Sequence, residues 1–268
     1  MSLNLANYEE LTKKAVAHFW SAGDGAQSKQ LTKGTTDVGN RSRATAGDSM
    51  DGFVELIKQI VIANGLPEES VFINRGAHVT LPGYYRATKM WDLLIVYRGS
   101  GANQLVAAIE LKSIASSFGN NLNNRCEEAL GSATDFSAAL REKAFGVSRP
   151  FTGYFMLMKD CEEVHNPVAV KEYHFEVFED FKEASYARRC ELFCQRLVTE
   201  KLYDAATALL SSDTEGKKGE YSELSEASSW RNWIASLAGH VASVAATLGP
   251  THRQISPLQQ TLPILDEL

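Results

Sequence analysis

The stretch WDLLIVYRGSGANQLVAAIELK, residues 91–112, decides the fold of this chain. It predicts two apolar β-strands, Leu93–Tyr97 and Leu105–Leu111, joined by a turn of glycine, serine and asparagine. Glu110 stands inside the second apolar run, where an uncompensated charge is costly. We therefore interpret Glu110 as a residue with a function.

The hairpin also brings charged side chains together at one end. If it folds about Gly101, paired residue numbers sum to twice 101, which places Asp92 directly opposite Glu110. Opposite residues have Cβ atoms about 5 Å apart, and two carboxylates at that distance repel. The two-residue period of a strand turns Lys112 to the face of Glu110 and their apolar neighbours to the other face. We expect a positive group between the acids, and a site able to hold a hard cation and position a water.

An acid followed about one hairpin later by Glu-x-Lys resembles the active-site pattern of the PD-(D/E)xK nuclease superfamily. In this chain Trp91 stands where the formula has proline, a loose position without a chemical role. The alternative is an exposed ion pair at a strand end, because Glu-x-Lys occurs by chance in many chains. The apolar run before Glu110 favours the nuclease interpretation.

The composition limits the class of protein. The 268 residues are 44% hydrophobic and 22% charged, which fits one domain with a full core. The cysteines show neither a zinc spacing nor a disulfide framework, so we expect reduced thiols and a cytoplasmic protein. No signal peptide opens the chain, and no apolar run approaches the roughly 20 residues of a membrane span. The net charge of −6 disfavours a general nucleic-acid coat.

Hydrophobic periodicity along the chain predicts an α/β fold with a central mixed sheet flanked by helices. We expect one domain over 1–268, with a core at about 50–160 and a helical C-terminal part at about 180–248. The expected helices span 4–20, 48–64, 123–143, 181–202, 202–211 and 229–248, and the further strands span 71–73, 78–81 and 151–159. The last of these strands should be parallel to its neighbour, because a helix separates the two. Cys190 and Cys194, one helical turn apart, are interpreted as a packed helix face.

Asparagines are concentrated just after the hairpin, ahead of a helix expected to start near Asn123 or Asn124. The segment holds Asn120, Asn121, Asn123, Asn124 and Arg125. Amide and guanidinium groups bond to purine edges, and a helix N-terminus offers N–H groups to phosphate. Turn formation and capping explain one or two of the asparagines, and four with an arginine less well. We interpret the segment as DNA-binding, with Asn121, Asn124 and Arg125 as the candidate base readers.

Positive side chains precede the hairpin. Residues 71–91 contain no acid and hold Arg75, Arg86 and Lys89, so they form a candidate positive surface. An ordinary exposed loop is the alternative. We expect Arg86 and Lys89 to hold the DNA backbone. The segment 21–48 carries four further basic residues without a regular pattern and is a candidate for ordering on a polyanion.

Several motifs in order resemble the XhoI-type family of type II restriction endonucleases. Beside Asp92 and Glu110-Leu-Lys112, they are LPGYYR at 81–86, SFGNNLNNRCEEA at 117–129 and DFKEASY at 180–186. The resemblance implies a PD-(D/E)xK restriction-endonuclease-like core with extra N- and C-terminal helices. It also implies a homodimer that cuts the palindrome CTCGAG after its first base, which leaves a four-base 5′ overhang. A cognate DNA methyltransferase would protect the host.

The resemblance further implies metal-assisted hydrolysis of a DNA phosphodiester. Asp92, Glu110 and the Leu111 carbonyl would bind Mg²⁺, and Lys112 would position or help deprotonate the attacking water. Members of the superfamily often carry an acid on the helix before the site that helps hold a metal-bound water. Glu55 is therefore a further candidate, with a solvated or salt-bridged glutamate as the alternative. The product would carry a 5′-phosphate.

Two other interpretations stay open at this stage. The chain could be another nuclease of the superfamily, such as a repair or junction-resolving enzyme. It could also be a DNA-binding protein on the same fold without catalysis. The presence of Asp92, Glu110 and Lys112 together disfavours the second interpretation.

Overall fold

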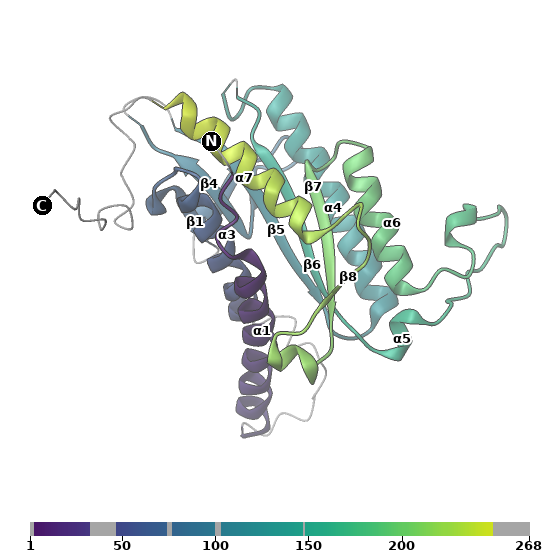
Figure 1. Ribbon diagram of the computed structural model, residues 1–268. Helices are drawn as coiled ribbons and strands as arrows, with labels where there is room; N and C mark the ends of the chain where they lie inside the picture. Colours follow the sequence, from purple (N-terminus) through teal and green to yellow (C-terminus); the bar gives the residue numbers. More distant parts are fainter. Residues whose placement is uncertain (1–2, 33–46, 74–76, 100–102, 147, 249–268) are drawn as a thin grey trace, which may run out of the picture.

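The computed structural model describes residues 3–32, 47–73, 77–99, 103–146 and 148–248. Its centre is a six-stranded mixed sheet with the strand order β1-β4-β5-β6-β7-β8 (Figure 1). These strands are β1 Val71–Ile73, β4 Leu93–Tyr97, β5 Gln104–Ile114, β6 Phe151–Lys159, β7 Ala205–Ser211 and β8 Ser222–Glu223. Two short strands, β2 (Thr80–Pro82) and β3 (Thr88–Met90), form a separate antiparallel pair.

Helices cover both faces of the sheet, as the sequence predicts for its fold class (Figure 1). Helices α4 (Phe118–Arg141) and α6 (Tyr186–Thr199) pack on one face. Helices α1 (Tyr8–Thr32), α3 (Asp51–Ala63) and α7 (Trp230–Thr247) pack on the other. The short helical turns are η1 Gly47–Met50, η2 Glu68–Ser70, η3 Ala77–Val79, α5 Glu162–His165, η4 Glu179–Phe181 and η5 Glu215–Lys218.

The alternation of strand residues gives each face its own apolar core. In β5, Ile109 and Leu111 belong to the core under α1, α3 and α7, whereas Ala108 and Ile114 belong to the core under α4 and α6. Glu110 and Lys112, which alternate with Ile109 and Leu111, therefore project toward α4. This confirms the predicted division of the strand into a charged and an apolar face.

The hairpin has the predicted register at the end that carries the charges. Leu93 pairs with Ile109 and Ile95 with Ala107, so the paired numbers sum to 202 there. Nearer the turn the register shifts by one, because Val106 is an extra residue in β5 and forms a β-bulge. The bulge lies on the turn side of the charged end and leaves the predicted alignment of Asp92 with Glu110 intact.

The strands beyond the hairpin show one confirmed and one wrong prediction. β6 is parallel to β5, with Glu110 beside Tyr154, as expected. Residues 202–211 were expected to be helical, but β7 is a strand that lies between β6 and β8 and runs parallel to β6. All its residues are buried, so its run of alanine and leucine has no exposed face to reveal the two-residue period. The C-terminal part, 180–248, is therefore not wholly helical.

Several helix boundaries differ from those expected. α1 continues to Thr32, so the first part of the segment expected to be irregular is helical, and residues 33–46 lie outside the described residues. α4 begins at Phe118, five residues before the earlier of the two expected starts. α3 ends as predicted before Gly65, which adopts a φ of +102° that favours glycine. The tail after 248 is also outside the described residues.

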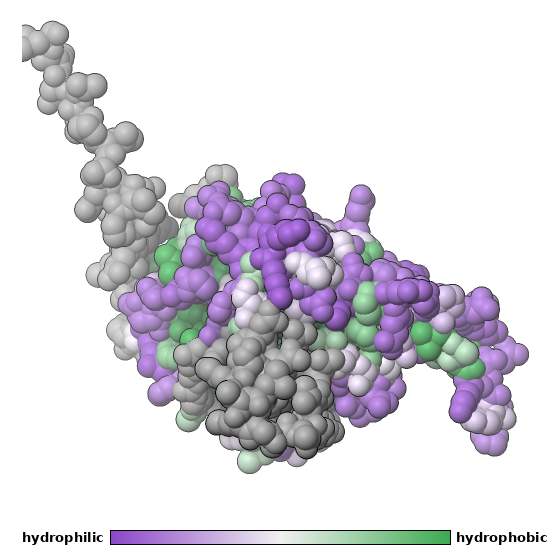
Figure 2. Space-filling view, turned by 90° about the horizontal axis from the view of Figure 1, so that it is seen from below, coloured by the Kyte–Doolittle hydropathy of each residue, from purple (hydrophilic) through white to green (hydrophobic). Residues whose placement is uncertain are grey.

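The segment between α5 and α6 projects from the body of the molecule (Figure 1), and Figure 2 shows both polar and apolar side chains on it. Tyr173, Phe175 and Phe178 are each more than three-quarters exposed there. None of the helices in the described part of the chain has the length and apolarity that a lipid bilayer requires.

Candidate active site

The segment that carries Asp92 is fixed by the tryptophan before it. Trp91 is 1% exposed, donates its main-chain N–H to the Val79 carbonyl at 2.9 Å and packs edge-on against Phe136 of α4. The position that has no chemical role in the sequence pattern thus has a structural one. It holds the start of β4 against α4 and aligns Asp92 with the end of β5.

Asp92 takes the place of a neighbouring strand along the end of β5. β4 begins at Leu93, which pairs with Ile109, so β5 continues beyond the start of β4. The Leu111 N–H donates to Asp92 Oδ2 at 2.9 Å. In a strand, the N–H and the carbonyl of one residue point to the same neighbour. The Leu111 carbonyl is therefore directed to the same open edge as Asp92.

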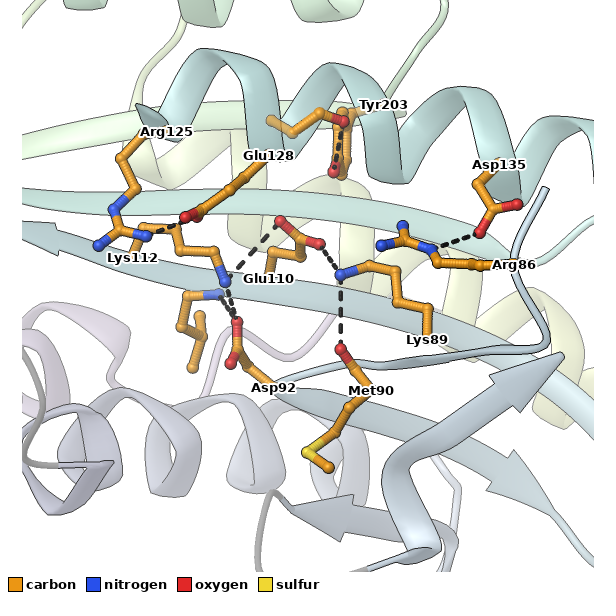
Figure 3. A network of polar contacts seen from close by, with 12 residues as sticks. Arg86, Lys89, Met90, Asp92, Glu110, Lys112, Arg125, Glu128, Asp135 and Tyr203 are labelled. Atoms are coloured by element: carbon orange, nitrogen blue, oxygen red, sulfur yellow. Dashed lines mark hydrogen bonds and ion pairs between the residues drawn. The ribbon is translucent and has the colours of Figure 1, made fainter. Parts of the chain in front are cut away.

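Glu110 lies between two lysines, which are the positive groups expected between the acids (Figure 3). Its side chain is 1% exposed, and Lys89 Nζ lies 2.5 Å from Oε1. Lys112 Nζ lies 3.8 Å from Oε2 and donates to Asp92 Oδ2 at 2.7 Å. The Lys89 pair does not have the angles of a hydrogen bond, so neither oxygen of Glu110 accepts one from the described residues.

The electrostatic effects of this cluster reach its neighbours. Burial opposes the charged form of Lys112, but the carboxylates of Glu110 and Asp92 outweigh burial, and the pKa of Lys112 is raised. Tyr203, buried below α4, has its pKa raised by burial and then by Glu110 and Asp92. The two carboxylates therefore act together on the surrounding titratable groups.

Helix α4 passes over the end of the cluster that holds Lys112. Arg125 Nη1 donates to Glu128 Oε2, and Figure 3 shows this pair beside Lys112. Arg125 Nε is buried and has no hydrogen-bond partner among the described residues. Arg125, predicted to read bases, therefore lies near the charged end of the hairpin, and Glu128 accepts a hydrogen bond from its guanidinium.

The asparagines occupy the first two turns of α4 and not a segment before it. Asn120, Asn123 and Asn124 are exposed. Asn121 is half-buried and its Nδ2 donates to the Ser116 carbonyl at 2.6 Å, which is the local turn role that the alternative interpretation assigns. Three amides therefore stay open to solvent, and the fourth is engaged at the start of the helix.

Asp135 is a site residue that sequence reasoning missed. It lies on α4 with its side chain 5% exposed and accepts hydrogen bonds at 2.8 Å from Tyr84 N, Tyr85 N and Arg86 Nε. Burial raises the pKa of Asp135, but these hydrogen bonds and the charge of Arg86 lower it by more. The pKa of Asp135 is therefore lowered overall. A signal was present, because Asp135 interrupts the buried stripe of α4.

The loop that carries Arg86 is held closely against this acid. A Cβ on Gly83 would lie 2.6 Å from Asp135 Oδ2 and 2.5 Å from the Arg86 carbonyl, so no other residue fits without a shift. Arg86 is still 47% exposed along its side chain. The structure therefore places Arg86 at the surface, at the opposite end of the cluster from Arg125 (Figure 3).

Other predicted residues lie elsewhere. Glu55 is half-exposed on α3, where it pairs with Lys58 at 3.0 Å and accepts from Gln59 Nε2 at 3.1 Å. It is not part of the network of Asp92, Glu110 and Lys112. Arg75 and the basic side chains of 23–46 lie outside the residues whose side chains are described.

The cysteine prediction is confirmed. Cys190 and Cys194 are fully buried on α6, as expected for a packed helix face. Within the described ranges, no group of three or more histidine, cysteine, aspartate or glutamate side chains is arranged to hold a metal ion. A cation at the hairpin would therefore have two carboxylates, main-chain oxygens and waters as ligands.

Comparison with known proteins shows which family the chain belongs to. The model of the family described as restriction endonuclease XhoI matches residues 29–223, which is more than half of the chain. The chain belongs to the XhoI restriction endonuclease family. This is a family of type II restriction enzymes, which are site-specific deoxyribonucleases.

Individual relatives agree with this assignment to the XhoI family. The type II restriction enzyme BstVI of Geobacillus stearothermophilus is 47% identical over 215 residues, which cover 79% of this chain and 95% of that protein. The type II restriction enzyme XhoI of Xanthomonas vasicola is 43% identical over 212 residues, covering 78% and 83%. The type II restriction enzyme AbrI of Azospirillum brasilense is 45% identical over 177 residues, covering 65% and 77%. No solved structure matches the chain.

Proposed function

We propose that this member of the XhoI family hydrolyses double-stranded DNA at the palindrome CTCGAG in a Mg²⁺-dependent reaction that leaves 5′-phosphate ends. The observation that carries the proposal is the end of the hairpin. Asp92 and Glu110 meet there, with the ammonium of Lys112 within 2.7 Å of one acid and 3.8 Å of the other. The related proteins named type II restriction enzymes support the class of substrate.

The ligands at this end fit Mg²⁺. Both oxygens of Glu110 are buried and accept no hydrogen bond from the described residues, so their charge depends on a nearby cation, a place that the ammonium of Lys89 takes at 2.5 Å. Asp92 accepts hydrogen bonds from Leu111 N and Lys112 Nζ, both at its Oδ2 atom. The Leu111 carbonyl is directed to the same edge of the sheet. Oxygen ligands are those that Mg²⁺ prefers, and Mg²⁺ keeps several waters. We assign Asp92, Glu110 and the Leu111 carbonyl to it, and leave Glu55 out of the set.

The residues around this position have defined tasks in the proposed reaction. When bound, Mg²⁺ would stabilise the charge that develops on the scissile phosphate and the leaving oxygen. Lys112 is an ammonium, because its pKa is raised, and it would donate a hydrogen bond that orients the attacking water. The water would lose a proton to solvent, and the leaving 3′ oxygen would take one from solvent. The water oxygen forms a bond to phosphorus as the bond from phosphorus to the 3′ oxygen breaks. The products are a 5′-phosphate and a 3′-hydroxyl.

Sequence reading would fall to the N-terminal half of α4. Asn120, Asn123 and Asn124 are exposed there, and Figure 3 shows Arg125 of the same helix near Lys112. Amides bond bidentately to adenine and guanidinium groups to guanine in the major groove. Two copies related by a two-fold axis would place one cutting centre on each strand of the palindrome. Host DNA would then need protection by a cognate methyltransferase.

A digest tests this proposal directly. A plasmid with one CTCGAG site and the same plasmid with one base of that site changed are incubated with the protein in Mg²⁺ or EDTA. We expect linear product from the first plasmid in Mg²⁺ alone. Mapping of the ends at nucleotide resolution should place the cut after the first cytosine.

Other outcomes separate the remaining interpretations. Equal cutting of both plasmids would indicate a nuclease of the superfamily without this specificity. Binding of the CTCGAG plasmid without any cutting in Mg²⁺ would indicate a DNA-binding protein, and would contradict the proposed role of the hairpin.

A further inference from the structure

The side chain of Lys89 reaches the buried acid from outside the catalytic hairpin. Lys89 lies on β3, in the small two-stranded pair, and its ammonium passes 4.8 Å from the centre of the Trp91 ring. It ends 2.5 Å from Glu110 Oε1, and its side chain is only 14% exposed. A lysine expected at the DNA-facing surface is therefore folded inward onto a carboxylate.

The charges at this place cancel. Asp92 and Glu110 contribute two negative charges, and Lys89 and Lys112 contribute two positive charges. The surrounding ionic groups are also paired, since Arg125 bonds to Glu128 and Arg86 bonds to Asp135. The described cluster thus has no net negative charge with which to attract a divalent cation, although it holds two carboxylates.

The two lysines differ in how firmly they are held. Lys112 is part of β5 and donates a hydrogen bond to Asp92 at 2.7 Å. Among the described residues, Lys89 has the poorly aligned pair with Glu110, a 3.4 Å contact to the Met90 carbonyl and the Trp91 ring at 4.8 Å. It also stands on a ladder of three residue pairs, and isolated two-stranded ladders are marginal in stability. Lys89 is therefore the ammonium that can move away.

We propose that Lys89 acts as an internal counter-ion that occupies the cation position at Glu110 until DNA binds. This rests on the proposed function, in which Glu110 holds the metal ion. A DNA phosphate would offer Lys89 an alternative partner, and its departure would leave the cluster with a net charge of −1. Binding of the metal ion is then coupled to binding of DNA, which keeps the DNA-free protein from holding a loaded cutting centre.

The first test measures cation binding by the full-length, DNA-free protein. Mn²⁺ is titrated into wild type and Lys89→Met, and free Mn²⁺ is followed by its electron paramagnetic resonance signal. We expect Lys89→Met to lower the Kd at least tenfold, which corresponds to about 1.4 kcal/mol. Lys89→Arg keeps the charge and should bind Mn²⁺ like wild type.

A matched control separates local from overall charge. Lys159 forms a comparable pair with Asp213 at 2.6 Å and is 24% exposed along its side chain. Lys159→Met removes the same charge from the chain and should leave the Kd for Mn²⁺ within twofold of wild type. Glu110→Gln should weaken Mn²⁺ binding in both the wild-type and the Lys89→Met background, because it removes the proposed ligand.

The second test asks whether the ammonium of Lys89 contacts a DNA phosphate in the complex. In EDTA, we expect Lys89→Met to bind a CTCGAG duplex severalfold more weakly than wild type. Its plot of log affinity against log salt concentration should be shallower by about one unit, since one phosphate contact is lost. Lys159→Met should leave this slope unchanged.

The outcomes distinguish this inference from the proposed function. Equal Mn²⁺ affinity of wild type and Lys89→Met, with weaker binding by Glu110→Gln, would overturn the role of Lys89 and leave the metal site standing. No binding of Mn²⁺ by Lys89→Met would overturn the role of Lys89, and the digest in Mg²⁺ would decide the proposed function separately. If Lys89→Met fails to give the circular dichroism spectrum of wild type, Lys89→Gln is measured and interpreted by the same criteria.

Discussion

Two buried carboxylates, Glu110 on β5 and Asp135 on α4, lie in one polar network and have opposite surroundings (Figure 3). Asp135 accepts hydrogen bonds from Tyr84 N, Tyr85 N and Arg86 Nε, all at 2.8 Å. Glu110 is more deeply buried and accepts none from the described residues. In the described part of the chain, its charge is met by two ammonium groups, those of Lys89 and Lys112.

The difference separates a structural acid from a functional one. A buried charge with several hydrogen bonds stabilises the elements that supply the donors, here the loop at 83–86 and α4. A buried charge without them costs free energy, and a fold retains it where binding a cation compensates that cost. In the proposed function, Glu110 is the acid that binds a ligand, whereas the hydrogen bonds of Asp135 stabilise the protein itself.

Lys112→Ala should have the largest effect. Among the described residues, it removes the only ammonium that lies within 4 Å of both Asp92 and Glu110, and a preorganised hydrogen-bond donor contributes about 10²–10³-fold to rate. We expect the single-turnover rate on a CTCGAG duplex in Mg²⁺ to fall about 10³-fold. Cutting within tenfold of the wild-type rate would remove Lys112 from the proposed mechanism.

Asp135→Ala and Glu110→Gln should separate stability from function. Loss of Asp135 leaves three donors without their acceptor, so we expect the free energy of unfolding in urea to fall by about 2 kcal/mol. Glu110→Gln leaves Lys89 without its carboxylate, but this ammonium can move out to solvent, and the side-chain amide of glutamine carries no charge that burial would penalise. We therefore expect a smaller loss of unfolding free energy than in Asp135→Ala. A larger loss of stability in Glu110→Gln would reverse the assignment of the two acids.

Arg86→Ala tests the outer member of the Asp135 pair. Because Arg86 is 47% exposed, we expect it to contact a DNA phosphate, and its removal should reduce the salt dependence of DNA affinity by about one unit of slope. Arg149, which pairs with Asp204 and is 64% exposed, provides the control, and Arg149→Ala should not change the slope. An unchanged slope in Arg86→Ala would confine Arg86 to its role at Asp135.

Acidification should reduce the stability difference between wild type and Asp135→Ala. The pKa of Asp135 is lowered in the folded protein, so its stabilising effect is present above the unfolded pKa of about 4 and is lost as pH falls through the folded value. We expect the difference in unfolding free energy to be smaller at pH 3 than at pH 7. A difference that grows on acidification would contradict the lowered pKa.

The hairpin could be predicted from sequence because its information is local. Two apolar runs and a short turn define the register, and the two-residue period decides which face carries Glu110 and Lys112. The bulge at Val106 leaves no comparable signal. It does not disturb the alignment at Asp92, since it lies toward the turn.

The errors arise where tertiary structure decides. β7 is buried on both faces, so its pattern of apolar residues does not distinguish a strand from a helix. It is a strand because it pairs with β6 and β8. Lys89 has the sequence context of a surface lysine, and its inward position depends on β3 pairing with β2. Asp135 lies more than 40 residues from Arg86 in sequence, so their pairing could not be inferred from local pattern.

Single-turnover cleavage of a CTCGAG duplex by Glu110→Gln and Asp135→Ala is the most direct test of Glu110 as the cation-holding acid. The assay is run in Mg²⁺ at a temperature where both variants are folded. We expect Glu110→Gln to be slower than wild type by at least about 10³-fold, and Asp135→Ala to stay within tenfold. Retention of wild-type cleavage by Glu110→Gln, or an equal loss in both variants, would contradict the distinction between the two acids.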